Sequence, residues 1–468
     1  MSKLNGDILY LIFKHFQDNI PTLYSCLLVN KTWCGIIIPI LWKNPWKILK
    51  FGKEESLLNV IISHLSDEVR NNLIQNIDFL INSYQRPLFN YISFCKHLDF
   101  EIIERIIPYS EDEDYEIPLI KNELVNLFIN ENTKFTHLYL SHLFDYQIHI
   151  IPGAKHCFSE LEFISCYTNM NDNVLDGLIE ICKPIKELKL FIAKCDNNYG
   201  FVKLIKAIKS LSKFHLTEIY LANYSRSFRE VLENSLIQHA GSIQYFTITD
   251  QLVTKILKSF TNLKRLELGG FNSPGGITKT WNHLENLTLP NLQILKTEKV
   301  PIKVLTSLIK NTSGYLTVIK INNGDHNNIE NKRIIQVIYQ NCPKLKSLKL
   351  AFMNSNILEL EQLLINCQYL YELHFVEYSL LIRDGINWDN VFEILTKSSP
   401  ASLFEFIFYF NFLPGCDSLK LFLKNWKGRH PMIIKLSYLG IIWDGQSEYI
   451  NLLKEYKAEG IVENYEVN

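Results

Sequence analysis

Long apolar runs are missing from this sequence, and so is any excess of charge of one sign. The 48 basic and 49 acidic side chains give a formal net charge of −1, which is no global reason to bind nucleic acid or an anionic membrane. Apolar stretches such as residues 35–41 are interrupted by proline and are too short to span a bilayer. The start of the chain lacks the apolar segment of a secretory signal. We therefore expect a soluble protein of the cytoplasm or nucleus, with neither nucleic acid nor a membrane among its partners.

Recognisable catalytic and cofactor-binding motifs are missing as well. No phosphate-binding loop, dinucleotide fingerprint, zinc-protease helix or nucleophile elbow occurs. The ten cysteines never form a C-x-x-C pair, which argues against zinc ribbons and redox motifs. Four histidines within residues 137–156 have spacings that match no helical metal pair. We expect no metal, no cofactor and no catalytic residue, and we interpret the cysteines as reduced and mostly buried thiols.

The sequence does contain a short phrase, L-x-x-L-x-L, that keeps returning. At 468 residues the chain is too long for one ordinary core, so such a repeat is informative. Copies begin at Phe135, Leu161, Ile185, Leu216, Ile243, Leu263, Leu292, Leu316, Leu345, Leu370, Leu403 and Ile433, with a degenerate copy at Leu88 and a competitor of Leu292 at Leu284. The mean period of about 27 residues falls in the range of leucine-rich repeats.

The intervals between these phrases have helical spacing of their apolar residues, so each repeat is expected to be one strand followed by one helix. Such units share a core only when they are stacked. The fourth and sixth places of each phrase should point into that core, which predicts burial of Leu188, Leu190, Leu266, Leu268, Leu348 and Leu350. The expected fold class is α/β, with parallel strands on the concave face of a solenoid and helices on its convex face.

The repeats, over roughly residues 85–445, resemble the leucine-rich repeats of F-box proteins, which look like the cysteine-containing type. Three phrases follow a similar lead-in at residues 181–184, 341–344 and 366–369, where a helix with a terminal cysteine turns into a strand. The sequence departs from the family pattern in its uneven intervals and in lacking a regular Asn/Cys position after many strands.

Residues 4–46 have a different character, with three short apolar helices that cannot form a self-sufficient core. The steps Val29-Asn30-Lys31-Thr32-Trp33 and Leu41-Trp42 resemble an F-box, although Leu4-Asn5 replaces the usual Leu-Pro. The resemblance implies docking to a Skp-type adaptor and, through it, to a cullin scaffold. It places these residues at or just behind the adaptor contact: Leu4, Ile8, Leu9, Phe13, Leu27, Val29 and Trp33.

The expected organisation is an F-box-like adaptor-binding domain at 1–46, a helical joint at 47–85 and a substrate-binding repeat region at 86–468. The implied function is the substrate-recognition subunit of an SCF-type ubiquitin ligase, which is not itself an enzyme. Three alternatives stay open. Residues 4–46 can be a helical cap of the repeats, the chain can be a repeat-only scaffold or sensor without a cullin, or it can be an enzyme on an unrecognised α/β fold.

The fifth place of the phrase points away from the core, and three consecutive repeats place lysine there: Lys296, Lys320 and Lys349. Neighbouring parallel strands lie about 4.8 Å apart, so the sequence predicts a basic ridge that repels itself. Arg265 and His374 flank it, and Glu298 is expected to neutralise it in part. One interpretation is an ordinary solvated strand face. The other is a substrate-binding surface for an acidic or phosphorylated segment of an unknown protein.

Overall fold

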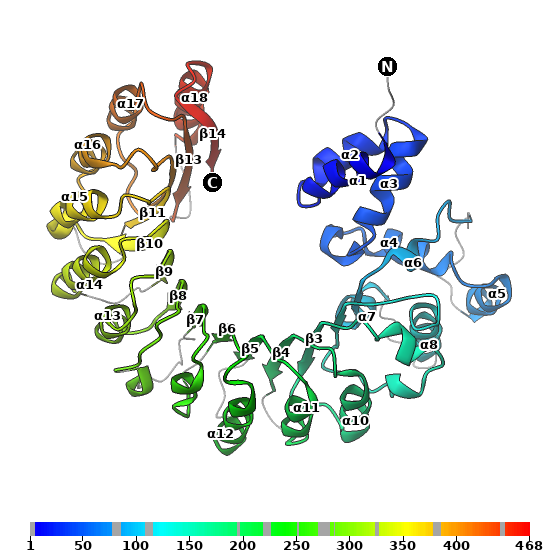
Figure 1. Ribbon diagram of the computed structural model, residues 1–468. Helices are drawn as coiled ribbons and strands as arrows, with labels where there is room; N and C mark the ends of the chain where they lie inside the picture. Colours follow the sequence, from blue (N-terminus) through cyan, green and yellow to red (C-terminus); the bar gives the residue numbers. More distant parts are fainter. Residues whose placement is uncertain are drawn as a thin grey trace. The chain divides into compact units, whose positions relative to one another are not determined.

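The computed structural model of the protein describes residues 5–76, 86–107, 116–193, 197–218, 226–249, 252–269, 281–284, 286–322, 327–377, 385–439 and 445–468. The chain forms two compact units (Figure 1). Unit 1 contains Met1–Leu211 and Ala222–Ser235, and unit 2 contains Ser212–Leu221 and Leu236–Asn468. The predicted boundaries of an F-box-like domain, a joint and a repeat region remain predictions.

Unit 1 begins with three short helices, α1 (Gly6–His15), α2 (Ile20–Leu27) and α3 (Lys31–Leu41). Each follows an asparagine whose side chain accepts a hydrogen bond from a backbone N–H of the first turn, the usual N-cap arrangement. Helix α3 packs against both α1 and α2. The shared core of the three helices consists of Leu9, Phe13, Leu23, Ile37 and Leu41.

Parallel strands follow in unit 1. They are β1 (His97–Asp99), β2 (His137–Tyr139), β3 (Phe163–Tyr167) and β4 (Glu187–Ile192), each paired in parallel with the next. The other elements of the unit are η1 (Pro45–Ile48), α4 (Glu54–Ile62), α5 (Asp67–Asn76), α6 (Tyr91–Phe94), α7 (Phe100–Ile106), α8 (Glu116–Phe128), η3 (Ile148–Ile150), α9 (Ala154–Cys157), α10 (Asp172–Ile181), α11 (Phe201–Ala207) and α12 (Arg226–Ser235).

Unit 2 contains strands β5 to β14, again in sequence order and parallel. The strands are β5 (Lys213–Glu218), β6 (Tyr245–Ile248), β7 (Arg265–Leu268), β8 (Ile294–Glu298), β9 (Val318–Asn322), β10 (Ser347–Phe352), β11 (Glu372–Glu377), β12 (Glu405–Phe410), β13 (Met432–Tyr438) and β14 (Val462–Val467). The helices are η4 (Leu236–His239), η5 (Ile256–Ser259), η6 (Asn282–Leu284), α13 (Ile302–Lys310), α14 (Asn328–Asn341), η7 (Asn354–Asn356), α15 (Ile357–Asn366), α16 (Trp388–Ser398), α17 (Cys416–Asn425) and α18 (Gln446–Ala458).

The two layers of unit 2 follow the repeat prediction. Strands β6 to β13 line the inner side of its curve, and helices α13 to α17 form the outer layer (Figure 1). The six leucines expected in the core are buried, and the strands are parallel, so both predictions are confirmed. Strands such as β7 and β9 alternate a buried side chain with a more exposed one, because successive side chains of a strand point to opposite faces. In β11 and β12 three consecutive side chains are buried.

The frame of three phrases was predicted wrongly. The phrase assigned to Leu88 falls partly on helix α6, and the first strand is β1, with Leu98 buried. The phrase assigned to Leu216 begins instead at Leu211, because Phe214 and Leu216 occupy its two buried places in β5. The phrase assigned to Ile433 was displaced by two residues, because the buried positions of β13 are Met432, Ile434 and Leu436.

The expectation of one helix per repeat also fails in part. Between β6 and β7 the described residues contain only the single turn η5. That interval is too short for both a longer helix and the two turns that would connect it to the strands.

Candidate docking surfaces

Helix α1 has apolar side chains on two sides. Leu9 and Phe13, one helical turn apart, are buried in the core shared with α2 and α3. Ile8, Leu11 and Ile12 also have the i, i+3, i+4 spacing that places residues on one helix face, yet all three are exposed. A helix of this length in a small bundle needs only one apolar face. The second face is therefore unused by the packing of the three helices.

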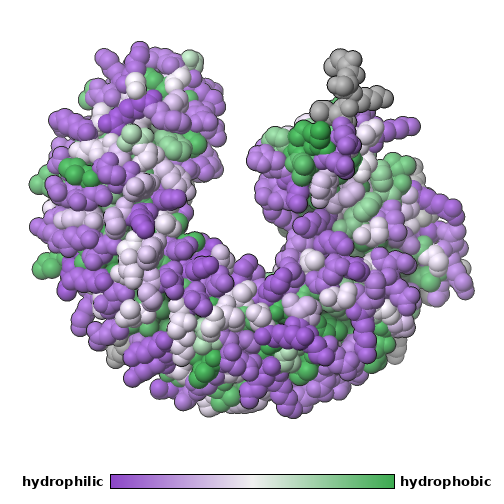
Figure 2. Space-filling view, viewed as in Figure 1, coloured by the Kyte–Doolittle hydropathy of each residue, from purple (hydrophilic) through white to green (hydrophobic). Residues whose placement is uncertain are grey.

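Helix α2 and the two residues after it carry further exposed apolar side chains. Tyr24 is exposed on α2, Leu28 is 88% exposed at the C-cap, and Val29 follows it, also exposed. We call the whole set the outer apolar face: Ile8, Leu11, Ile12, Phe16, Tyr24, Leu28 and Val29. Figure 2 shows apolar surface gathered over the N-terminal helices. Exposed apolar groups concentrated on so few residues mark an interaction site more often than a solvated surface.

The residues predicted for the adaptor contact divide into three groups. Ile8 and Val29 belong to the outer apolar face. Leu9 and Phe13 lie behind it in the core. Leu27 and Trp33 are half-buried and pack against that core. The remaining residue, Leu4, lies outside the described residues.

Sequence reasoning missed two strongly exposed residues of this face, Leu11 and Leu28. A signal for Leu11 existed in its spacing of three residues from Ile8, which forms a second apolar stripe. Leu28 had no such signal, since a helix end can direct a side chain either way. The tryptophan predicted next to the contact stabilises the bundle, because the rings of Phe13 and Trp33 meet edge to face at 5.0 Å.

The segment after α3 joins these helices to the first repeat. The Trp42 ring lies 4.5 Å from the Tyr91 ring of α6, centroid to centroid. The Trp46 indole N–H donates a 2.7 Å hydrogen bond to the His97 carbonyl oxygen of β1. The Lys96 backbone N–H donates to the Lys43 carbonyl at 2.9 Å. Residues 42–46 therefore cover the edge of the first repeat, as expected for a cap.

The second surface is a row of side chains on the strand layer of unit 2. Residues at one level of the ladder pair in register, in the order Glu267, Lys296, Lys320, Lys349 and His374. The three lysines thus occupy neighbouring strands, as the fifth-place rule predicted. Their electrostatic surroundings differ from the expected self-repelling ridge.

Glu267 neutralises one end of this row. Its carboxylate accepts from Arg265 Nε at 2.8 Å and lies 3.0 Å from Lys296 Nζ. Burial alone would raise the pKa of Glu267, but the hydrogen bonds and charges of Lys296 and Arg265 outweigh it and the pKa is lowered. Lys296 and Arg265 therefore share the carboxylate of Glu267, a fifth-place residue whose pairing with them was not predicted.

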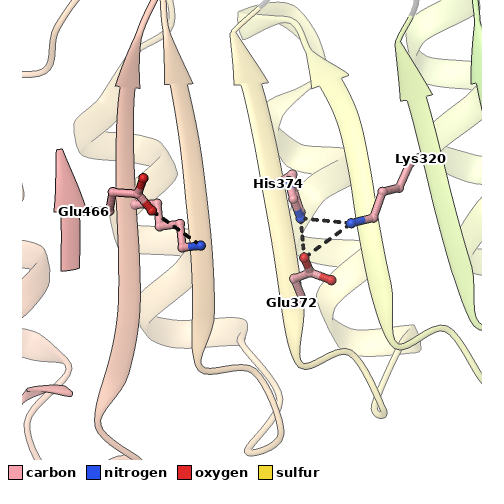
Figure 3. A network of polar contacts seen from close by, with 5 residues as sticks. Lys320, Glu372, His374 and Glu466 are labelled. Atoms are coloured by element: carbon pink, nitrogen blue, oxygen red, sulfur yellow. Dashed lines mark hydrogen bonds and ion pairs between the residues drawn. The ribbon is translucent and has the colours of Figure 1, made fainter. Parts of the chain in front are cut away.

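A second carboxylate, Glu372 at the start of β11, neutralises the middle of the row. The Lys320 side chain from β9 extends toward Glu372 and His374 of β11 (Figure 3). Lys320 Nζ lies 3.5 Å from Glu372 Oε1 and 3.4 Å from His374 Nε2, and His374 is hydrogen-bonded to the same carboxylate. The hydrogen bond from His374 is the main reason that the pKa of Glu372 falls to about 2.

Lys349 has a different environment. Its ammonium lies over the Tyr409 ring of β12, 4.6 Å from the ring centroid, a favourable cation–π arrangement. Burial first and the Lys320 charge second lower the pKa of Lys349, and Glu298 partly opposes them. Of the three lysines, it is the one whose described contacts include no ion pair within 4 Å.

The residues that the structure describes also bear on metal binding and on membrane spanning. In that part of the chain, no group of three or more His, Cys, Asp or Glu side chains is placed to hold a metal ion. His137, one of the four clustered histidines, instead stacks on His97 with ring centroids 3.9 Å apart. Among the same residues, no helix combines the length and apolar character needed to cross a membrane.

Comparisons with known proteins give a likeness of fold at most. No protein-family model matches the chain, and no curated protein matches it either. One similar solved structure is a Bacteroides fragilis protein with 10% identity and a TM-score of 0.32, matched over 55% of this chain and 65% of that one. Another is the leucine-rich repeat-containing protein LegL7 from Legionella pneumophila, with 15% identity and a TM-score of 0.35, matched over 57% of this chain and 86% of that one. The chain thus spans less than two thirds of the Bacteroides protein, and the repeat assignment rests on the strands described above.

Proposed function

We propose that this chain is the substrate-recognition subunit of an SCF-type ubiquitin ligase. In this proposal the N-terminal helices dock to a Skp-type adaptor, and through it to a cullin, while the repeats hold a protein substrate. The observation that carries the proposal is the outer apolar face, which lies on a segment whose sequence resembles an F-box. A surface of this kind needs a partner with its own apolar groove or helix.

The proposed role requires no catalytic group in this chain. A receptor of this kind holds the substrate near a conjugating enzyme that carries activated ubiquitin, and the rate rises because the effective concentration rises. The proposed location is the cytoplasm or nucleus, where such ligases work. Neither nucleic acid nor a membrane is a proposed partner.

Adaptor docking is tested by changing Leu28 and Val29 together to aspartate in the full chain. Docking would then bury two charges in an apolar contact, at a cost of several kcal/mol by order of magnitude, so affinity for a purified Skp-type adaptor should fall at least a hundredfold. The matched control changes two exposed apolar residues of the repeat helices, Ile329 and Leu358, to aspartate. The control should bind as the wild type does, in isothermal titration calorimetry.

A second function has an observation in its favour. Residues 42–46 pack on the first repeat, as a plain cap would, which suits a repeat-only scaffold or sensor without a cullin. That function predicts no measurable adaptor affinity in the wild type. Adaptor binding that survives the Leu28 and Val29 changes would also reject the proposed docking face.

The proposed substrate surface consists of Lys296, Lys320, Lys349 and His374 of the strand-layer row together with Arg265 beside it. Changing the three lysines to glutamate should abolish binding of a labelled ten-glutamate peptide, and wild-type binding should weaken as salt rises. Fluorescence anisotropy measures both. The control changes Lys310, Lys424 and Lys454, exposed on the helices, to glutamate. Equal binding by the two triple variants would assign the row to an ordinary solvated strand face.

A further inference from the structure

An apolar groove of about 560 Å³ runs along the turns that lead into β10 to β13. This is the edge of unit 2 at which its strands begin, where Tyr371 of the groove directly precedes Glu372, the carboxylate that contacts Lys320 of the charged row. The side chains that form its walls are Lys346, Tyr369, Tyr371, Ser402, Phe404 and His430. Tyr369 is 63% exposed, and Tyr371 and His430 are exposed too. The groove is therefore open to solvent along its length.

The repeat itself builds the groove. Lys346, Tyr371 and Phe404 each immediately precede a strand, and each therefore holds the same place in consecutive repeats. The Tyr371 N–H donates to the Lys346 carbonyl at 2.9 Å, and the Phe404 N–H donates to the Tyr371 carbonyl at 3.2 Å. These bonds fix three side chains side by side at the ladder spacing.

Three of the rings form a continuous series. The Tyr371 and Phe404 rings are nearly parallel, with centroids 6.2 Å apart, and the Phe404 and His430 rings lie 4.8 Å apart. Such a series of rings forms an elongated aromatic surface. It suits a narrow, stiff and apolar ligand more than a stacked base.

The polar groups of the groove restrict its ligand further. None of the side chains lining it is a carboxylate or an amide. The single Ser402 hydroxyl proton is already shared between the Gln368 and Leu370 carbonyl oxygens, which lie 2.9 and 2.8 Å from Oγ. Burial, and then the charges of Glu372 and Glu405, raise the pKa of Tyr371, so its phenol keeps its proton at neutral pH.

These groups favour a ligand rich in carbonyl acceptors and poor in N–H donors. A peptide added as a β-strand needs unpaired backbone groups, and here the Tyr371 and Phe404 N–H groups already donate to the Lys346 and Tyr371 carbonyls. A quaternary ammonium would be repelled by Lys346 and would find no carboxylate among the lining side chains. A polyproline II helix has free carbonyls, few N–H groups and low conformational entropy to lose.

We propose that this groove binds a proline-rich segment of a partner protein in the polyproline II conformation, with an acidic residue beside the prolines. The rings hold the pyrrolidines, the Tyr369 and Tyr371 hydroxyls donate to the ligand's carbonyls, and Lys346 pairs with the flanking carboxylate. No residue that lines this site belongs to the outer apolar face or to the lysines of the row, although Tyr371 directly precedes Glu372, which contacts Lys320. The site can therefore exist whether or not the proposed ligase function is correct.

The test uses the full chain and a labelled peptide of five prolines followed by two glutamates. We expect saturable binding by fluorescence anisotropy, at least tenfold tighter than for peptides with five alanines or with two lysines in place of the glutamates. The Tyr371→Phe substitution keeps the ring and removes one hydroxyl, and should weaken binding about threefold to tenfold. The Lys346→Glu substitution should reverse the preference, favouring the lysine-ended peptide.

The matched control is Tyr315→Ala, which removes an exposed ring that contacts Lys344 outside the groove. It should bind the peptide as the wild type does. Circular dichroism checks that each variant is folded. No binding by the wild type up to millimolar peptide would overturn the proposal. So would equal affinity for proline and alanine peptides, or unchanged affinities in both Tyr371→Phe and Lys346→Glu.

Discussion

At the scale of single residues, the pKa of the Asp99 carboxyl group is subject to two opposite influences. It ends β1 and caps α7, where its side chain accepts from the Ile102 backbone N–H at 3.0 Å. A cap favours a carboxylate through the hydrogen bond and the helix dipole. Burial works against the charge and is the largest influence, so the pKa of Asp99 rises from 3.8 to about 6.

The sign of the pH effect follows from proton binding. Between pH 3.8 and 6 the folded state holds more of the Asp99 proton than the unfolded state does, so stability falls as pH rises through this window. Asparagine caps helices as well as aspartate does and carries no charge. Asp99→Asn should therefore be more stable than the wild type at pH 7.5, by on the order of 2 kcal/mol, and about equal to it near pH 4. Urea unfolding at the two pH values measures this difference, and equal stabilities at pH 7.5 would contradict it.

At the scale of elements, the phrase L-x-x-L-x-L located most strands, because the fourth and sixth places must be apolar wherever a strand covers the core. It failed where other residues compete for those places. In β5 the fourth place of the phrase is occupied by Phe214 and not by a leucine. In β13 residues 432–434 are all apolar, so the sequence does not show which of them points into the core.

The two candidate surfaces were predictable to different degrees. The fifth places identified the lysines of the row, since an alternating strand leaves little choice of direction. The sequence indicated Glu298 as a neutralising acid, and the Glu298 charge does act on Lys349. It did not indicate Glu372, because this residue occupies the third place of its own phrase and meets Lys320 only through an extended side chain. Because α1 has apolar residues on two sides, its sequence alone does not show which of them form the core. Only packing against α3 separates Leu9 from Ile8.

At the scale of the molecule, repeat proteins distribute stability through contacts between neighbouring units. The end of such an array exposes apolar surface unless something covers it. In unit 1, Trp46 is buried, donates to the His97 carbonyl of β1, and lies 5.9 Å from the Phe128 ring, centroid to centroid. A deletion of residues 1–46 would therefore remove a structural cap together with the outer apolar face, and point changes separate the two roles.

Trp46→Ala should lower stability locally by about 3–5 kcal/mol, because a buried indole is lost. Trp46→Phe keeps a ring, and should lose about 1 kcal/mol with the hydrogen bond. Native-state hydrogen exchange locates the effect. In Trp46→Ala the amides of β1 and β2 should exchange faster, while those of β12 and β13 keep their protection, since coupling passes only between neighbouring repeats. The Leu28 and Val29 double variant is the control and should leave β1 protected. Unchanged exchange at β1 in Trp46→Ala would show that the repeats do not need this cap, and residues 1–46 would then be a separable docking domain.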